Sequence, residues 1–148
     1  MAESCPISGL KNILVATDGS LYSEKALHEA INLAKSCGTM LYVMSVVEVN
    51  PEYEAIAPEL VERSDEEARM FLDAAGKCAE REKVSCITIV HRGEDPAKFI
   101  IEEAERIKAD MIIMGKFGRK KGLKKLLMGS ATAKVITHAH CKVLVVPS

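Results

Sequence analysis

The residues best suited to binding chemistry lie in one glycine-rich and strongly basic segment near the C-terminal end. Glycine lets a ligand approach the backbone closely, and fifteen residues contain Gly115, Gly118, Gly122 and Gly129. Residues 116–125 carry six positive charges and no acidic residue, whereas the whole chain has a net charge of −1. A nearly neutral protein that gathers positive charge in one place points to an anionic ligand.

A short helix is predicted over 130–139, directly after this segment. Backbone amides at a helix N-terminus and the Ser130 hydroxyl can hold a phosphate oxygen, assisted by the helix dipole. The segment matches neither a Walker A loop nor a GxGxxG fingerprint. The alternative is that the glycines only form turns and the lysines only face solvent. The glycines and the positive charges occur together, at a position where the strand order described below predicts a crevice, and this favours a phosphate-bearing ligand.

Short apolar runs alternate with segments of helical period along the chain. Strands are predicted at 12–17, 40–49, 85–91, 110–114 and 143–146. Because a helix is predicted in each connection, the sheet is expected to be mainly parallel and covered on both faces. We predict an α/β fold with an open, doubly wound, five-stranded sheet in the order 3-2-1-4-5 and helices on both faces.

This strand order makes strands 1 and 4 neighbours whose following connections run to opposite sides of the sheet. Such a switch point opens a crevice at the carboxyl ends of the strands, where ligands bind. The two loops expected there are Asp18-Gly19-Ser20 and the segment that begins at Gly115. Asp18 supplies a carboxylate to this crevice. The alternative is that Asp18 only forms an Asx turn or a helix cap and binds no ligand.

Capping residues predict where the longer helices begin and end. Ser20 suits the N-cap of the first helix, and Gly38 suits its C-terminal end. Residues 50–58 contain two prolines and are predicted to form a loop. Ser64-Asp65-Glu66-Glu67 has the pattern of a capping box, which predicts the start of the next helix. Asp95-Pro96 predicts the start of the third.

Length and composition describe an ordinary globular chain of 148 residues, 48% hydrophobic and 28% charged. We expect a tail at 1–10 and one domain at 11–148. No apolar run approaches the roughly 18–20 residues that span a bilayer, so no membrane association is expected. The first residues lack a basic region followed by an apolar core, which favours a cytoplasmic location.

The cysteines are odd in number and widely scattered, without a CxxC pair. A disulfide scaffold or a zinc site would space them differently. We therefore expect all of them to be packed thiols without a catalytic role. They are Cys5, Cys37, Cys78, Cys86 and Cys141.

Several other activities are disfavoured. His138, His140 and Cys141 lie close in sequence, but nothing nearby completes a closed zinc site, so no metal site is predicted. Aromatic residues make up 4% of the chain, with no Trp, which disfavours single-stranded nucleic acid as a partner. Ser20, Ser130 and Cys141 have no base at a recognisable spacing, so little or no catalysis is expected.

From end to end, the chain resembles the universal stress protein family. The resemblance is carried by ILVATDGS, SVVE, RGEDPAKFIIEEAERIKADMIIMGKFG and GSATAKVITHAHCKVLVVP, at 13–20, 45–48, 92–118 and 129–147. Members that bind nucleotide show G-x-x-G followed at a fixed distance by G-[S/T]. This chain has Gly115-Lys116-Phe117-Gly118 and Gly129-Ser130, with ten residues between Gly118 and Gly129, one more than those relatives have.

The resemblance implies how a nucleotide would be bound. Asp18 would meet the ribose hydroxyls, and Ala16 and Thr17 would line the base. Ala16 stands where many relatives have proline. The backbone of Val46 would meet the adenine edge. The remaining implied contacts are Met114 and Gly115 beneath the sugar, and Gly118, Gly129, Ser130 and Ala131 at the phosphates. A carboxylate suits a diol, and a nest of amide groups suits a polyphosphate.

The expected function is a stress-related regulatory module that binds an adenine nucleotide, ATP with Mg²⁺ or Mn²⁺ on its phosphates. Phosphate is expected to order the 116–128 loop, with little or no catalysis. The alternative is a nucleotide-free dimeric scaffold whose basic loop docks an acidic partner or nucleic acid. A homodimer through the apolar edge strand Lys142–Val146 is expected in both cases.

Overall fold

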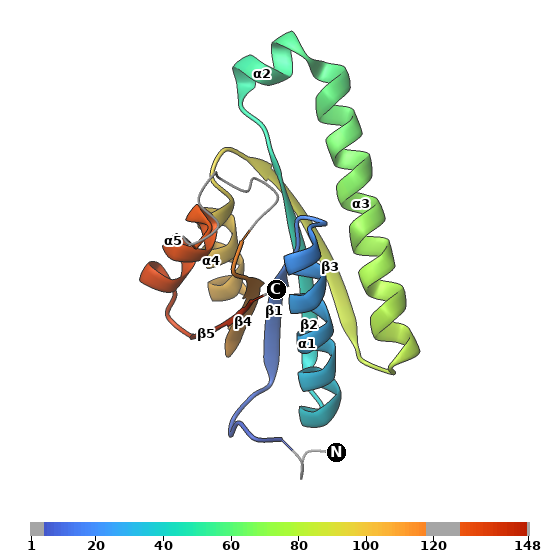
Figure 1. Ribbon diagram of the computed structural model, residues 1–148, viewed down its shortest axis with the longest axis vertical. Coiled ribbons are helices and arrows are strands. Elements are labelled where there is room, and N and C mark those ends of the chain that lie inside the picture. The colour runs from blue at the N-terminus through green and yellow to red at the C-terminus, as the bar shows by residue number, and fades with distance from the viewer. Residues whose placement is uncertain (1–4, 118–127, 148) are drawn as a thin grey trace.

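The computed structural model describes residues 5–117 and 128–147. One parallel sheet runs in the order β3-β2-β1-β4-β5, which confirms the predicted fold class and strand order (Figure 1). The strands are β1 Asn12–Ala16, β2 Met40–Glu48, β3 Cys86–Gly93, β4 Met111–Gly115 and β5 Lys142–Val146. The helices are α1 Leu21–Cys37, α2 Pro51–Ile56, α3 Pro58–Arg81, α4 Pro96–Arg106 and α5 Ser130–His138.

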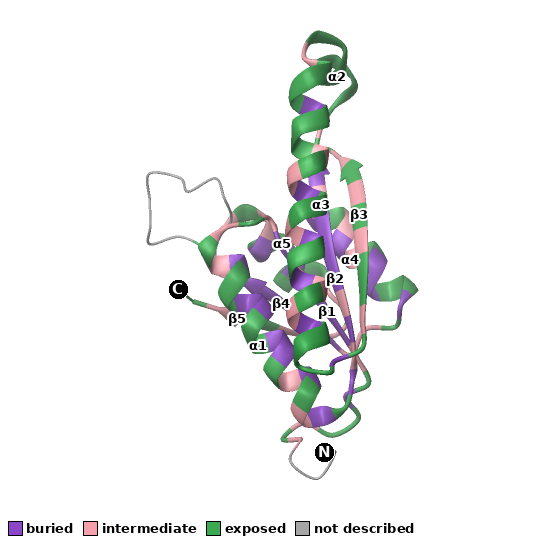
Figure 2. Ribbon diagram, turned by 90° about the vertical axis from the view of Figure 1, so that its right-hand side faces the viewer, coloured by how far each residue is buried: buried purple, intermediate pink, exposed green. Residues whose placement is uncertain are grey.

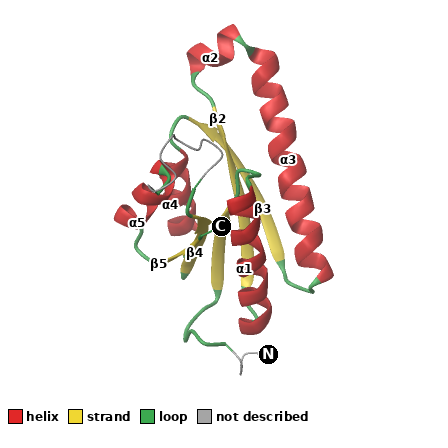
Figure 3. Ribbon diagram, in the orientation of Figure 1, coloured by secondary structure: helices red, strands yellow, loops and turns green. Residues whose placement is uncertain are grey.

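Helices cover both faces of the sheet (Figure 3). In β1, Ile13 and Val15 face α1 and α3, whereas Leu14 faces α4 and α5, and all three side chains are fully buried. A central parallel strand that is apolar on both faces needs a helix layer on each side. The continuous apolar runs of β1 and β4 therefore explain the two cores.

Helix α1 begins and ends at the predicted residues. The Ser20 hydroxyl accepts a hydrogen bond from the Ser23 amide at 3.2 Å, as an N-cap does. Gly38 ends the helix with a φ of 66°, a left-handed conformation that favours glycine. These caps place the start of α1 immediately after the turn at residues 17–20.

The predicted loop at 50–58 and the predicted helix start at Ser64 are both wrong. Residues 51–56 form α2, capped by the Asn50 side chain, which accepts from the Tyr53 amide at 2.6 Å. Helix α3 already starts at Pro58, and the Ser64 hydroxyl lies inside it and donates to Leu60 O at 3.0 Å. Proline is tolerated at the first helical position, and the buried Val61 extends the apolar stripe to this earlier start.

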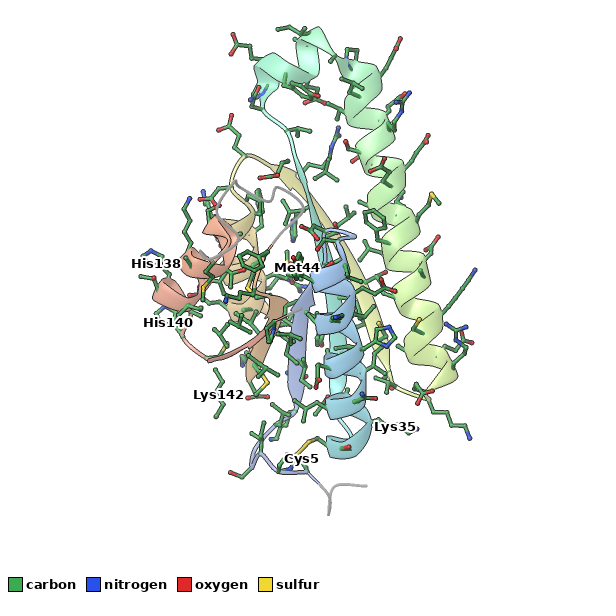
Figure 4. The ribbon with its side chains drawn as sticks, in the orientation of Figure 1. Cys5, Lys35, Met44, His138, His140 and Lys142 are labelled. Carbon is green, nitrogen blue, oxygen red and sulfur yellow. A yellow bond between two sulfur atoms is a disulfide. The ribbon has the colours of Figure 1, made fainter. Side chains whose placement is uncertain are left out.

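The expectation that all the cysteines are thiols is also wrong, because a disulfide joins Cys5 to Cys37. It ties the start of the described chain to the end of α1 (Figure 4). Ile7 and Leu10 pack on the core beside it, so the tail folds back along the domain, a contact that cysteine spacing does not reveal. The division into a tail at 1–10 and a domain at 11–148 stays a prediction.

The three other cysteines, Cys78, Cys86 and Cys141, are free. Burial raises the pKa of the Cys86 thiol. Burial, followed by the negative charge of Asp110, raises that of Cys141. A raised pKa disfavours the reactive thiolate. Within the described residues, no helix combines the length and apolar character needed to cross a bilayer.

Candidate functional site

The switch point predicted from the strand order lies at the carboxyl ends of β1 and β4. The two strands pair in parallel, with Val15 opposite Ile113. The chain leaves β1 into α1 on one face, and α5, which follows β4 in the chain, packs on the other. The turn at residues 17–20 and the start of the loop after Gly115 therefore lie at the same edge of the sheet.

The turn after β1 is held by a small network of hydroxyl groups. The Thr17 amide donates to Met44 O at 2.9 Å, which ties the turn to β2. The buried hydroxyls of Thr17 and Ser23 lie 3.0 Å apart, and the Asp18 amide donates to the Ser23 hydroxyl at 3.4 Å. Ser23 was not singled out by the sequence, because a serine in a first helical turn is common. Its burial reveals its role.

Asp18 is oriented by its own turn. Its Oδ1 accepts from the Ser20 amide at 2.9 Å, the bond of an Asx turn. The next residue, Gly19, has a φ of 79°, and a Cβ built on it would lie 2.2 Å from the Phe71 ring of α3. The backbone conformation therefore favours glycine at this position, and a larger residue would have to displace the Phe71 ring.

The start of α5 is fixed to the end of β4. The buried Thr132 hydroxyl donates to Gly115 O at 2.9 Å, and the Gly129 amide donates to Lys116 O at 2.9 Å. The Lys116 amide in turn donates to Val146 O at 3.0 Å. Thr132 is a second residue that the sequence did not single out, since only its burial shows that it positions the helix.

The N-terminus of α5 is suited to an anion. Gly129 occupies the N-cap, and within the described residues no side chain caps this helix. The amides of the first turn of a helix lack partners within the helix and carry partial positive charge. Ser130 is exposed and Ala131 half-buried, so the first turn is accessible to a ligand.

An aromatic pair lies beside this edge. The rings of Tyr22 and Phe117 meet edge to face at 5.2 Å, and Lys116 Nζ lies 5.4 Å from the centre of the Phe117 ring. A Cβ on Gly115 would lie 2.8 Å from Tyr22 Cβ and 2.9 Å from its backbone carbonyl carbon. Gly115 is therefore needed for α1 to pack closely against β4.

The other predicted site residues that the structure describes lie near the same edge. Ala16 ends β1 opposite Met44, and Val46 lies two residues further along β2, half-buried. Met114 is buried in the core on the α4 and α5 side, which leaves its backbone rather than its side chain for a ligand. Gly118 lies outside the described residues.

A buried carboxylate, that of Glu103, connects α4 to the sheet near the end of β2. Glu103 is 4% exposed and accepts from Arg106 Nε at 2.6 Å and from His91 Nε2 at 2.8 Å. Burial favours a higher pKa for Glu103, but the bonds and positive charges of Arg106 and His91 outweigh it and lower that pKa. His91 is the register partner of Val46, so this cluster supports the strand pair beside the crevice.

Two surface grooves lie away from the predicted residues. One of about 400 Å³ lies between α4 and α5 and includes Asp95, Lys134 and His138. The other, of about 370 Å³, lies between α3 and the start of β3. Neither groove includes a predicted site residue.

The histidines near the end of α5 are exposed at the surface. Among residues 5–117 and 128–147, no group of three His, Cys, Asp or Glu side chains could hold a metal ion. His140 Nε2 lies 3.3 Å from Glu105 Oε1. Both His138 and His140 lie at the surface end of α5 (Figure 4).

Comparison with known proteins gives a consistent result. The family model described as the universal stress protein family matches residues 9–147. A universal stress protein of Methanocaldococcus jannaschii is 41% identical over 144 residues, which cover 92% of this chain and 81% of that protein. Universal stress protein UspA of Lactobacillus plantarum superposes with a TM-score of 0.84 at 25% identity, covering 95% of this chain and 99% of that one. A structure from Burkholderia pseudomallei has a TM-score of 0.74 at 30% identity, covering 97% and 100%. The chain belongs to the universal stress protein family.

Proposed function

We propose that the crevice between β1 and β4 binds an adenine nucleotide, with ATP as the ligand. The observation that carries this proposal is the meeting of two loops at one edge of the sheet. The Asx turn of Asp18 follows β1, and the start of α5 is bonded to Gly115 and Lys116 at the end of β4. A carboxylate beside a helix N-terminus suits a sugar diol joined to a phosphate chain.

In this proposal, the residues nearest the strand ends bind the sugar and the base. Asp18 accepts from the ribose hydroxyls, and its bond to the Ser20 amide holds the carboxylate in place. Ala16 and Thr17 line the base, and the backbone of Val46 meets the adenine edge. The backbone of Met114 and Gly115 lies beneath the sugar.

In this proposal, the start of α5 binds the phosphates. The amides of Gly129, Ser130 and Ala131, with the Ser130 hydroxyl, bind phosphate oxygens, and Gly118 contributes from the other end of the basic segment. The phosphates would bring a divalent ion, Mg²⁺ or Mn²⁺, into the site, since Mg²⁺ is commonly bound through substrate phosphates. The absence of a three-residue metal cluster among the described residues is compatible with an ion that arrives on the nucleotide.

Two structures of the same fold support an adenine nucleotide as the ligand class. A universal stress protein was solved in complex with cAMP, at 24% identity and a TM-score of 0.68. Another, from Archaeoglobus fulgidus, was solved in complex with dAMP, at 19% identity and a TM-score of 0.65. At these identities the likeness concerns the fold, so the case for this chain depends on its own residues.

The role that fits this site is regulatory. Nucleotide phosphates would offset part of the six positive charges of residues 116–125 and order the 116–128 loop. At most slow ATP hydrolysis is expected, and we place the protein in the cytoplasm. The alternative remains a nucleotide-free scaffold, which a salt-dependent gel shift with nucleic acid, unaffected by ATP, would favour.

We also propose a homodimer through β5. This strand is at the edge of the sheet, where its outer backbone groups can pair with a second copy, and Leu144 is 37% exposed. Sedimentation at micromolar concentration tests this arrangement. A species of only 16.1 kDa would exclude it.

Calorimetry on protein freed of co-purified nucleotide tests the binding proposal. ATP is expected to bind, and Asp18→Ala to weaken binding by about tenfold to a hundredfold, the cost of losing a hydrogen bond to a charged group. Asp73→Ala, which removes an exposed carboxylate from α3, is the control and should leave binding unchanged. Wild-type protein that binds neither ATP nor AMP at millimolar ligand would refute the proposal.

A further inference from the structure

Strand β3 forms the edge of the sheet opposite to β5. It is eight residues long and contains neither proline nor lysine, two residues that protect exposed edges in many proteins. Figure 2 shows β3 coloured as intermediate or exposed along its length. Ile87 is 44% exposed and Val90 38%. A long edge strand with exposed apolar side chains is suited to pairing with a further strand.

Half of the backbone groups of β3 point away from the sheet. Ser85 O accepts from the Leu41 amide at 2.9 Å, and Gly93 O accepts from the Val49 amide at 3.0 Å. Because alternate residues of a parallel strand bond the same neighbour, the odd-numbered residues between these two bond β2. The even-numbered residues therefore direct their amides and carbonyls to the open side of the edge. They are Cys86, Thr88, Val90 and Arg92.

Helix α3 runs beside this edge and leaves a groove there. The groove, of about 370 Å³, lies between α3 and the start of β3 and includes Gly76 and Glu80. A Cβ built on Gly76 would lie 4.0 Å from Thr88 Cγ2. Arg69 lies seven residues before Gly76 and Glu80 four residues after it, so the three lie on one flank of the helix. The flank of α3 that faces the edge therefore exposes one positive and one negative side chain.

We propose that β3 pairs with the β3 of a second copy in antiparallel orientation, around a twofold axis at Ile89. In this register, Thr88 of one copy pairs with Val90 of the other. Cys86 pairs in the same way with Arg92, so the outward backbone groups of all four residues are bonded. The same patch of both copies is in contact, as a twofold interface requires. An extended peptide of another protein would bond the same groups but would leave the flank of α3 uncovered.

The α3 helices of the two copies meet at a suitable distance. Helix α3 packs on both β2 and β3, so in the pair the two α3 axes lie about two strand spacings apart, roughly 10 Å. Packed helices lie about 8–10 Å apart. Since Gly76 lies over Thr88, an axis at the next residue of β3 passes close to the midpoint between Arg69 and Glu80. The antiparallel arrangement then brings Arg69 of each helix to Glu80 of the other, so this flank is complementary in charge to itself.

Disulfide trapping on the full chain tests the register. Thr88→Cys and Val90→Cys are made separately in a background with Cys78→Ser, Cys86→Ser and Cys141→Ser, and are oxidised alone and as an equal mixture. Paired Cα atoms in this arrangement lie about 5.5 Å apart, within the range of about 4.4–6.8 Å that a disulfide spans. The mixture should give at least five times more covalent dimer than either variant alone, because each position faces the other.

Each variant alone is the matched control for random collisions, since it carries the same thiol at the same edge. A dimer through β5 adds nothing to the signal, because β5 lies at the opposite edge of the sheet. A covalent yield in the mixture no higher than in the single variants would overturn the proposal.

Charge reversal tests the helix contact with the same measurement. With Arg69→Glu in both members of the mixture, the covalent yield should fall about threefold to tenfold, since two attractive pairs become repulsive. Arg69→Glu in one member and Glu80→Arg in the other recreates both pairs and should restore the yield. Glu102→Arg, at an exposed site of α4, should leave the yield unchanged. A yield that does not respond to Arg69→Glu, or that does not recover in the mixed pair, would refute the contact between copies.

Discussion

In the oxidised protein, the Cys5–Cys37 disulfide is predicted to supply a large share of the stability of the domain. It closes a loop across a sequence separation of 32 residues, and the entropy of closing a loop of this length corresponds to about 3.7 kcal/mol at 25 °C. Reduction, or Cys5→Ala, should remove a free energy of this order. Cys5 is half-buried, so the substitution itself removes little packing. In a domain of this size, the loss should lower Tm by about 7–15 °C.

Urea unfolding and thermal melts with and without a dithiol reductant measure this effect. Reductant should destabilise the wild type and leave Cys5→Ala unchanged, because the variant has no bond to lose. Thiol titration of the unfolded, unreduced chain should find three of its five cysteines free. Five titratable thiols, or a reductant effect below about 1 kcal/mol, would contradict the loop-closure argument.

Two further predictions concern the surroundings of the crevice. Gly19→Ala should cost about 2–4 kcal/mol in urea unfolding, from the left-handed backbone and the clash with Phe71. Adding Phe71→Leu should recover part of the loss, and a strictly additive double-mutant cycle would refute the contact. Folding lowers the pKa of Glu103. The charged carboxylate therefore stabilises the fold at pH values above 4.5, which is the ordinary pKa of this group. This contribution is lost as pH falls through the folded pKa. The stability difference between wild type and Glu103→Gln should therefore shrink below pH 4.5. A difference that stays constant down to about pH 3 would contradict this.

The strands and the ends of α1 could be predicted because their signals are local, and the handedness of the crossovers then leaves few strand orders. Apolar runs identify the strands, a helix in each connection makes the sheet parallel, and Ser20 and Gly38 have the chemistry of caps. The carboxyl-end position of Asp18, Gly115 and Ser130 then follows from the topology.

The missed features depend on contacts between distant residues. Ser64 to Glu67 has the composition of a capping box, but the burial of Val61 and the proline at 58 favour an earlier helix start. The pairing of Cys5 with Cys37 requires the tail to fold back on the core, which spacing does not encode. Ser23 and Thr132 are ordinary helical residues in sequence, and their roles follow from burial against Thr17 and Gly115.

Nuclear magnetic resonance on ¹⁵N-labelled, nucleotide-free protein, titrated with ATP, tests the central claim most directly. The account predicts that amide shifts concentrate at residues 16–20, at 114–117 and at 129–132, where the ends of β1 and β4 meet the start of α5. Shifts centred instead on the groove between α4 and α5, or no shifts at millimolar ATP, would contradict a nucleotide site in this crevice.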